Sequence, residues 1–479
     1  MRISRHLSFG LLGLLALVGL FGPVSGGSAA TAASSGWSKA LQVPGSGVLN
    51  VDGNAAVASV SCPTSGNCVA GGHYTDGSRL SQAFVVEEKN GVWGHATAVP
   101  GLAALGSGGA STVNSVSCSS PGNCAVGGHY DGGAFVVDES NGAWGDAIEV
   151  PGIPALYSAD AHVDSVSCAT AGNCAAGGAA YLGNGDPAAF VVDETGGTWG
   201  RAVFFANPIG WTDAGPTLVS CPAPGNCTAG STYVESLAFG ATLHVLVADE
   251  KAGSWGTPVA LGTSYYIGLN TLSCPAPGNC AAGGYYDNGG GQAFVADETN
   301  GVWGAPLAVP GSVKLNAGDG AQVTSVSCWA AGNCAAGGVY IDRALHGQAF
   351  VASETNGKWG RALKVPGAAA LNKGHPYTGN LETGGARITA ISCGAPRDCN
   401  AGGYYHDRSG NEQAFVVSEK NGVWGNAMKV PGLATLDSGH SSQVTSISCP
   451  TARDCVAGGQ YSHHSHGYYS FQAFVVARR

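Results

Sequence analysis

An all-β fold is predicted for this chain: an eight-bladed β-propeller of four-stranded antiparallel blades, closed by the N-terminal strand completing the last blade. Two cysteines six positions apart recur eight times along the 479 residues, and a tryptophan followed by a small residue also recurs eight times. The repeats start with an isolated fourth strand and end with an unfinished blade. A period of roughly 50 to 65 residues indicates one supersecondary unit stacked against copies of itself.

The unit at residues 57–100 shows how one blade is built. Residues 57–62 alternate apolar and polar side chains, as a half-buried strand does, and a turn rich in Pro, Ser and Gly follows. Asn90 and Gly91 are typical of a type I′ hairpin turn, because both residue types readily take positive φ angles. No helical pattern intervenes, which favours a propeller blade. The four strands are expected at 57–62, 68–74, 82–88 and 92–99.

The two ends of the repeat region predict how the ring closes. Residues 36–45 have the pattern of a fourth strand without the first three, and residues 474–479 have that of a third strand without a fourth. The first segment therefore completes the last blade and leaves no exposed sheet edge. An open solenoid is the alternative, but it would not need this split repeat. The eight tryptophans of the repeat, which we expect in the core, are Trp37, Trp93, Trp144, Trp199, Trp255, Trp303, Trp359 and Trp424.

All sixteen cysteines fall into the eight pairs, and none is left over. In an exported protein such pairs form disulfides. Zinc binding is the competing interpretation, but zinc sites use shorter spacers and join two cysteine pairs, whereas each pair here stands alone. We therefore expect no cofactor and eight disulfides, at Cys62–Cys68, Cys118–Cys124, Cys168–Cys174, Cys221–Cys227, Cys274–Cys280, Cys328–Cys334, Cys393–Cys399 and Cys449–Cys455.

Residues 1–32 have the pattern of a secretory signal peptide. Two arginines precede an apolar run at 9–21, and small residues end the segment. We expect residues 33–479 to form a single propeller domain that is secreted or associated with the cell wall. The formal charge of −10 provides no basic surface for nucleic acid or anionic lipid. No later segment approaches the roughly 18 apolar residues of a membrane span. A monomer without membrane insertion or a nucleic-acid partner is predicted.

Loops on one face of the predicted ring vary in length and composition, from residues 131–133 in one unit to residues 462–470 in another. Such loops on a rigid scaffold are the usual place for binding and catalysis. The last three blades hold the densest set of imidazole, carboxylate and guanidinium groups, which suit acid–base chemistry, metal binding or recognition of a carboxylated sugar. The catalytic candidates are His375, His406, Asp407, Arg408, Glu412 and His463. The metal candidates are His463, His464 and His466, in a segment that is equally typical of a polar loop tip.

A tyrosine ends the second strand of most units, on the same variable face. Repeated tyrosines there can stack on sugar rings at several equivalent weak sites, and packing between blades is the alternative. With residues of the long loops, the candidate binding residues are Tyr74, Tyr130, Tyr286, Tyr340, Tyr405, Tyr461, Tyr377, His440 and Tyr468. A glutamate also precedes the hairpin in seven units. Because an active site is normally unique, we expect this glutamate to make a turn or inter-blade contact.

The repeat S-x-S-C-x5-C-x-A-G-G-x-Y, followed by Q-A-F-V and N-G-x-W-G-x-A-x-x-V-P-G, resembles the cysteine-containing propeller repeats of secreted actinobacterial proteins, most of which are uncharacterised. More remotely it resembles sialidase-type and photosystem-assembly-factor-type propellers, whose S-x-D-x-G-x-x-W box is absent here. The resemblance covers nearly all of residues 36–479. It implies the fold and secretion, and it carries over no catalytic residue.

Three classes of function are left open by the sequence. The favoured one is a secreted binding or interaction module whose variable-loop face takes an extracellular glycan, a cell-wall ligand or an extracellular protein. The alternative is a glycan-processing enzyme, a glycosidase or polysaccharide lyase, with its site at the channel mouth formed by the last three blades. A structural scaffold without a small ligand is the third. We favour binding because the residues that break the repeat form no recognised catalytic constellation, so the question of enzymatic activity stays open.

Overall fold

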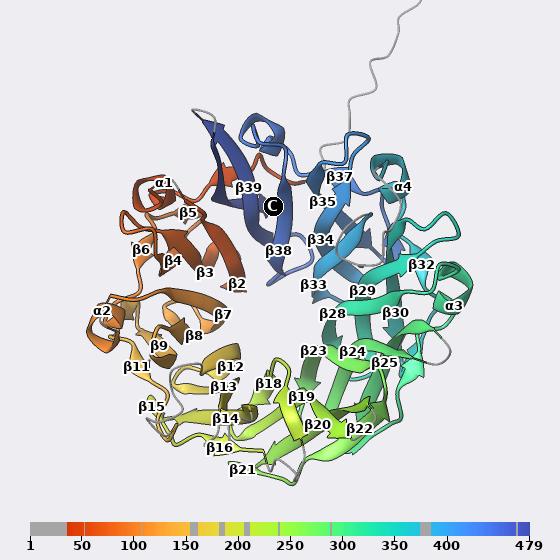
Figure 1. Ribbon diagram of the computed structural model, residues 1–479, viewed down its shortest axis with the longest axis horizontal. Coiled ribbons are helices and arrows are strands. Elements are labelled where there is room, and N and C mark those ends of the chain that lie inside the picture. The colour runs from red at the N-terminus through yellow and green to blue at the C-terminus, as the bar shows by residue number, and fades with distance from the viewer. Residues whose placement is uncertain are drawn as a thin grey trace, which may run out of the picture. The chain divides into compact units, whose positions relative to one another are not determined.

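The structure is a computed structural model that describes residues 36–51, 53–106, 108–153, 161–181, 187–205, 211–237, 240–287, 290–373, 385–465 and 468–479. Gly36–Arg479 form one compact unit, and the expected signal peptide at 1–32 lies outside the described residues. In that unit eight antiparallel sheets surround a common axis, as Figure 1 shows. This arrangement confirms the predicted eight-bladed propeller. The blades are numbered 1 to 8 in chain order.

The first strand of each blade lies nearest the axis, and the second and third strands follow outward (Figure 1). The first strands are β2 (Ala56–Thr64), β7 (Ser111–Ser120), β12 (His162–Thr170), β18 (Leu218–Ala223), β23 (Ile267–Ala276), β28 (Ala321–Ala330), β33 (Arg387–Ala395) and β38 (Ser442–Ser448). The second strands are β3 (Asn67–Thr75), β8 (Asn123–Tyr130), β13 (Asn173–Tyr181), β19 (Asn226–Leu237), β24 (Asn279–Asp287), β29 (Asn333–Ile341), β34 (Asp398–His406) and β39 (Cys455–Ser465). The third strands are β4 (Ser81–Lys89), β9 (Gly133–Ser140), β14 (Pro187–Thr195), β20 (Gly240–Lys251), β25 (Gly291–Thr299), β30 (Gly347–Thr355), β35 (Glu412–Lys420) and β40 (Tyr468–Arg478).

The fourth strand of blades 1 to 7 is interrupted, whereas the sequence pattern predicted one continuous strand. In blade 1 both pieces pair with β4, and the segment between them leaves the sheet. The interruption frees the Ala96 N–H to donate to the carbonyl oxygen of Pro44 in the preceding blade, at 2.7 Å. Ala147 and Pro100 form the same bond one junction later, so the break ties neighbouring blades together. The pieces are β5 (Val92–Trp93) with β6 (Thr97–Ala98), β10 (Ala143–Trp144) with β11 (Ile148–Glu149), β15 (Thr198–Trp199) with β16 (Val203–Phe204), β21 (Ser254–Trp255) with β22 (Val259–Ser264), β26 (Val302–Trp303) with β27 (Leu307–Ala308), β31 (Lys358–Trp359) with β32 (Leu363–Lys364), and β36 (Val423–Trp424) with β37 (Met428–Lys429).

Single-turn helices follow several Val-Pro-Gly segments, a feature that the strand pattern did not predict. Gly101 takes a φ of 78° before one of them, a conformation that glycine adopts at no steric cost. No helix in the described part of the chain is long and apolar enough to cross a membrane. The helices are α1 (Ser46–Leu49), α2 (Leu102–Leu105), α3 (Ser312–Leu315), α4 (Ala368–Leu371) and the 3₁₀ helix η1 (Leu433–Thr435).

Strand β1 (Leu41–Gln42) closes the ring as predicted. It pairs antiparallel with β40, with Leu41 opposite Val475, and supplies the fourth strand of blade 8. One extra strand, β17 (Trp211–Ala214), extends blade 4 by pairing with β19. The sheet edge of the last blade is therefore covered by the start of the repeat region, which removes the exposed edge that an open array would present.

The serines of the S-x-S-C segment join the first strands of neighbouring blades. The Ser61 hydroxyl accepts a hydrogen bond from the Cys118 backbone N–H of blade 2, at 2.9 Å. At the closing junction, the Ser448 hydroxyl of blade 8 accepts the equivalent bond from the Cys62 N–H of blade 1, at 3.0 Å. The junction that closes the ring thus uses the same contact as an interior junction.

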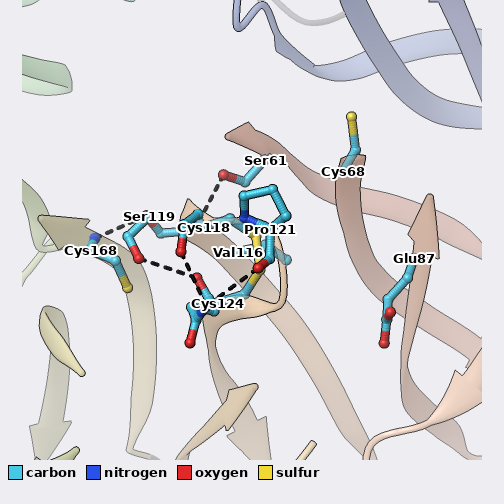
Figure 2. Close-up of a disulfide and its surroundings, with 12 residues drawn as sticks. Ser61, Cys68, Glu87, Val116, Cys118, Ser119, Pro121, Cys124 and Cys168 are labelled. Carbon is cyan, nitrogen blue, oxygen red and sulfur yellow. Dashed lines mark hydrogen bonds between the residues drawn. A yellow bond between two sulfur atoms is a disulfide. The ribbon is translucent and has the colours of Figure 1, made fainter. Parts of the chain in front are cut away.

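All eight cysteine pairs form disulfides, and the described chain has no free cysteine. Figure 2 shows Cys118–Cys124, with Ser61 of blade 1 bonded to Cys118. Each disulfide closes the turn between the first and second strands, and the Asn-Gly turn lies beside it, because the Gly91 N–H donates to the Gly66 carbonyl oxygen at 2.8 Å. We call this side of the ring the disulfide face. The other connections form the opposite, variable-loop face.

Tryptophan and acidic side chains join neighbouring blades near the disulfide face. Trp199 Nε1 donates to Asp138 Oδ2 of blade 2, at 2.8 Å, and Trp255 Nε1 donates in the same way to Asp193 of blade 3. The glutamate beside each aspartate is buried, which makes the repeated acid pair part of the packing between blades. Burial disfavours the charged form and raises the pKa to about 7 at Glu139, Glu194, Glu250, Glu298 and Glu354.

Candidate functional site

A cavity of about 560 Å³ lies where the first strands of blades 5 to 8 face the central axis. Five of its lining residues come from those first strands, and two come from the second and third strands of blade 7. Most of the lining side chains are polar. The lining residues are Asn270, Thr324, Arg387, Thr389, Tyr404, Glu412 and Gln443.

Blade 7 places four functional side chains on one face of its sheet. Arg387 lies opposite Tyr404 in the register of β33 and β34, and His406 lies opposite Glu412 in the register of β34 and β35. Opposed residues share a face, and so do residues two positions apart on a strand. Ala414, opposite Tyr404, packs in the core that blades 7 and 8 share. The four side chains therefore project on the face of blade 7 that meets blade 8.

Glu412 is a carboxyl with altered acidity in this cavity. Its pKa is raised to about 7, mainly by burial and in addition by the nearby Asp437 carboxylate, because two like charges repel. Asp437 is itself held in place, since its Oδ1 accepts hydrogen bonds from the Ser441 N–H and the Ser462 hydroxyl, each at 3.0 Å. Near neutral pH Glu412 can thus donate or accept a proton.

Arg387 supplies positive charge to the same cavity. No carboxylate oxygen in the described ranges lies within 4.0 Å of its guanidinium, although Glu412 lines the same cavity. The Gln443 side chain from blade 8 likewise has no hydrogen-bond partner among the described residues. Two polar groups therefore stay available to a ligand.

Other cavity residues hold the wall in shape. The Asn270 side-chain amide donates to the Val323 carbonyl oxygen of the next blade, at 2.8 Å. The Thr324 hydroxyl donates to the Ile388 carbonyl oxygen, at 2.6 Å, and so links blade 6 to blade 7. These bonds cross the blade junctions at the axis, so the cavity is preformed by the ring.

His406, a catalytic candidate from the sequence, lies beside this constellation. Its Nδ1 is 2.9 Å from the Gly385 carbonyl oxygen and 3.1 Å from the Gly385 nitrogen, so the tautomer decides which bond forms. Its ring meets the Tyr404 ring edge to face, with centroids 5.8 Å apart. The contact orients His406 next to Tyr404 and Glu412.

Asp407, the next candidate, is engaged by its own loop. Its Oδ1 accepts hydrogen bonds from the Ser409 N–H at 2.8 Å and from the Asn411 N–H at 3.0 Å. Asp342 makes the same contacts in the corresponding loop of blade 6. A contact that recurs in other blades indicates a loop-shaping role for this carboxylate.

The remaining candidates are spread over the variable-loop face. Arg408 and His440 are exposed and do not line the cavity. His463 and His464 are exposed neighbours on β39, so their side chains project from opposite faces of the strand. Within the described ranges no three His, Cys, Asp or Glu side chains are grouped to hold a metal ion. His375, Tyr377, His466 and the side chain of Tyr468 lie outside the described residues.

The repeated tyrosines lie mostly inside the ring. Their burial favours the alternative that the sequence left open, packing between blades, because a ring enclosed by protein offers no face to a sugar. Tyr286 is half-buried and meets the Phe294 ring edge to face, at 6.2 Å. The buried rings, at 8% exposure or less, are Tyr74, Tyr130, Tyr340, Tyr405 and Tyr461.

Sequence reasoning selected Glu412 and His406 but missed Arg387 and Tyr404. A usable signal for Arg387 is present in the repeat, because it is the only Lys or Arg in any first strand. Tyr404 stands where the other repeats have His, Ala, Thr, Val or Gln, apart from Tyr285 in blade 5. Its neighbour Tyr405 occupies the repeated tyrosine position, so the sequence pattern selected Tyr405 as a candidate binding residue instead of Tyr404.

No family model matches the chain, and no curated protein matches it. Several solved structures share its general architecture at low identity. Sqt1 from Chaetomium thermophilum is 13% identical, with a TM-score of 0.46, over 89% of this chain and 97% of that one. An ulvan polysaccharide lyase is 9% identical, with a TM-score of 0.45, over 92% and 96% of the two chains. A Hadza microbial sialidase is 10% identical, with a TM-score of 0.35, over 91% and 68%. These likenesses carry no functional assignment.

Proposed function

We propose that this protein is an extracellular propeller that binds an acidic glycan in the cavity lined by Arg387, Glu412 and Gln443. The observation that carries the proposal is the Arg387 guanidinium, which lines a polar cavity of about 560 Å³ without a carboxylate partner in the described chain. A guanidinium is the side chain best matched to a carboxylate, because it donates two parallel hydrogen bonds. The cavity volume falls in the usual range for small-ligand sites.

The other cavity residues suit a sugar rather than a simple anion. A protonated Glu412 donates a hydrogen bond to a hydroxyl, and the Gln443 amide can donate and accept. Tyr265, in the connection that leads into blade 5, is 78% exposed, and Tyr266 beside it is 45% exposed and contacts the Tyr285 ring, with centroids 4.6 Å apart. Exposed aromatic rings on the variable-loop face provide surfaces on which further sugar units can stack.

An extracellular location is part of this proposal. Eight disulfides are consistent with an oxidising compartment, where such bonds persist. The signal-peptide pattern of residues 1–32 supports the same location.

Calorimetric titration with oligogalacturonate, and with the same oligosaccharide in fully methyl-esterified form, tests the proposal. Esterification removes the charge and leaves the sugar rings intact. We expect the charged form to bind at least about tenfold more tightly, and Arg387→Gln to lose that preference. Arg408→Gln, an exposed arginine on the same face, is the matched control and should bind as the unmodified protein does. Equal binding of both forms, or normal binding by Arg387→Gln, would contradict the proposal.

Glycan cleavage is a second candidate, and one observation favours it. Glu412 titrates near neutral pH beside Tyr404 and His406, and a carboxyl of this acidity suits general acid–base catalysis. Release of new reducing ends from oligogalacturonate, abolished in Glu412→Gln, would establish an enzyme. Binding without any release would leave the protein as a binding module.

A further inference from the structure

On the disulfide face, Arg479 lies at the junction between blades 8 and 1. Residues 474–479 align with residues 84–89 of blade 1, so Arg478 stands where blade 1 has Glu88. Arg479 follows it and reaches across the closing junction, where its Nη2 pairs with Oε1 of Glu88. The repeated glutamate of blade 1 thus receives a guanidinium from the neighbouring blade.

The next junction has a cavity in the equivalent place. A cavity of about 420 Å³ lies between blades 1 and 2, and its lining includes Pro63, Val69, Pro121, Glu87, Glu139 and the Cys118–Cys124 disulfide. Figure 2 shows the disulfide and Pro121 on one side of this region and Glu87 on the other. The wall combines apolar surface with carboxylates.

Glu139 is the carboxyl in this cavity that forms no ion pair. It is only 3% exposed, and neither of its carboxylate oxygens has a hydrogen-bond partner. Glu87, in contrast, accepts a bond from Trp144 Nε1 at 2.8 Å and pairs with Lys89. Burial and, to a smaller extent, the Glu87 charge raise the pKa of Glu139 to about 7, against the opposing effect of the nearby Lys89 charge. A buried acid held in this way costs free energy, and a bound cation would offset that cost.

We infer that the cavity between blades 1 and 2 binds the guanidinium group of an arginine side chain presented by another polypeptide, with Glu139 in the role that Glu88 has toward Arg479. The cavity lies on the disulfide face, opposite the proposed glycan site, so the two sites are independent. Pro63, Val69 and the disulfide contact the methylene groups of the arginine, which pack favourably on apolar surface.

A guanidinium fits this cavity better than a metal ion does. Calcium takes six to eight oxygen ligands, whereas Glu139 is the one carboxylate here without a partner among the described residues that line the cavity. The chain itself supplies the precedent, since the group that pairs with the equivalent Glu88 is an arginine.

The test is a titration of the full chain with acetyl-Gly-Arg-Gly-amide and with the same peptide carrying citrulline, the neutral isostere of arginine. We expect the arginine peptide to bind and the citrulline peptide to bind at least about tenfold more weakly. Glu139→Gln should lose the arginine preference, while Glu149→Gln, an exposed carboxyl outside the cavity, should keep it. Arg387→Gln should also keep it, which separates this site from the glycan site.

Two further measurements make the outcome decisive. Lys89→Met removes the cation that already lies in the cavity, pairs with Glu87 and lowers the pKa of Glu139, so it should tighten binding several-fold. At pH 7 binding should release a proton from Glu139, which calorimetry in buffers of different ionisation enthalpy detects. Equal binding of the two peptides, or an unchanged affinity in Glu139→Gln, would overturn the inference.

Discussion

Arg479 forms an ion pair with Glu88, a residue 391 positions earlier in the sequence. The Glu88 side chain is 1% exposed, and burial raises its pKa while Arg479 lowers it. The guanidinium passes over Gly91, where an added Cβ would lie 2.6 Å from Arg479 Nη1. Gly91 also has a φ of 81°, so the turn requires glycine for its backbone and for the space beside it. The ion pair adds a side-chain contact between blades 8 and 1, across the junction at which the ring closes.

Arg479→Ala is expected to lower the free energy of unfolding by about 1 to 3 kcal/mol, because it leaves a buried carboxyl without its partner. Urea denaturation under non-reducing conditions measures the change. Adding Glu88→Gln should recover part of the loss, since a neutral amide costs less to bury than a carboxylate. No recovery in the double variant would mean that the arginine acts through packing alone.

The first serine of S-x-S-C is replaced by Leu218 in blade 4 and by Ala390 in blade 7, and at the second of these positions the serine contact can be restored. The Ser325 hydroxyl accepts a bond from the Ile391 N–H at 3.1 Å, but Ala390 stands at the equivalent position of the next blade and offers no acceptor to Ile447. Ala390→Ser should therefore raise the free energy of unfolding by about 1 kcal/mol, and Ser325→Ala should lower it by a similar amount. Urea denaturation of the two variants measures both changes in the free energy of unfolding. Changes of the same sign would contradict a stabilising role for the serine hydrogen bond.

Stability should decline as the pH rises through neutrality. Five repeated glutamates have pKa values raised to about 7 in the folded chain, against 4.5 for an ordinary glutamate, so the folded state binds more protons between those values. The free energy of unfolding then falls with pH, by up to about 1.4 kcal/mol per pH unit for each proton. The five residues are Glu139, Glu194, Glu250, Glu298 and Glu354.

Denaturation midpoints between pH 5 and pH 8 measure this slope. His73 and His129, whose pKa values burial lowers, act in the opposite direction below pH 6.5. A variant with Gln at all five glutamates keeps both histidines, so its difference from the unmodified protein isolates the glutamates. An equal slope in the two proteins would show that these carboxyls do not set the pH dependence.

Glycan binding should weaken above pH 7 for a separate reason. Glu412 has a pKa raised to about 7, so it is neutral at pH 6 and negatively charged at pH 8. The charged form repels a sugar carboxylate held by Arg387. We expect affinity for oligogalacturonate to fall about tenfold from pH 6 to pH 8, equivalent to about 1.4 kcal/mol, and Glu412→Gln to show little change. Titration calorimetry at the two pH values checks this, and a pH dependence that persists in Glu412→Gln would assign it to another group.

Local patterns predicted most of the blade. The Asn90-Gly91 turn, the alternation in residues 57–62 and the cysteine spacing are all short-range features, and each of them occurs in the structure as expected. The interruption of the fourth strand was missed, because it depends on the Ala96 N–H meeting Pro44 in another blade. The hydrogen bonds that the two serines of S-x-S-C accept from the next blade were not predicted either, because they also join two blades.

The candidate site could be predicted only in part. Glu412 and His406 were selected because they break the repeat in a variable loop, but the same criterion selected Asp407, which its own loop engages. Both rings are buried, but Tyr405, which follows the repeat, packs in the core shared with blade 6, whereas Tyr404 beside it lines the cavity. Neighbouring residues on a strand project from opposite faces of the sheet. The sequence pattern does not show which of the two faces packs against which neighbouring blade.

Blade number, disulfide pairing and the closing strand followed from the sequence because each depends on turns and strand alternation within one repeat, or on counting repeats. The cavity at the axis and the junction between blades 1 and 2 depend on the packed ring. Arg387 and Gln443 line one cavity, and Glu87 and Glu139 line the other, only because each blade covers its neighbour. The two residues of each pair are about one repeat apart in the sequence. Burial and the presence or absence of a neighbouring charge set the pKa of the carboxyls among them, and both depend on how the blades pack.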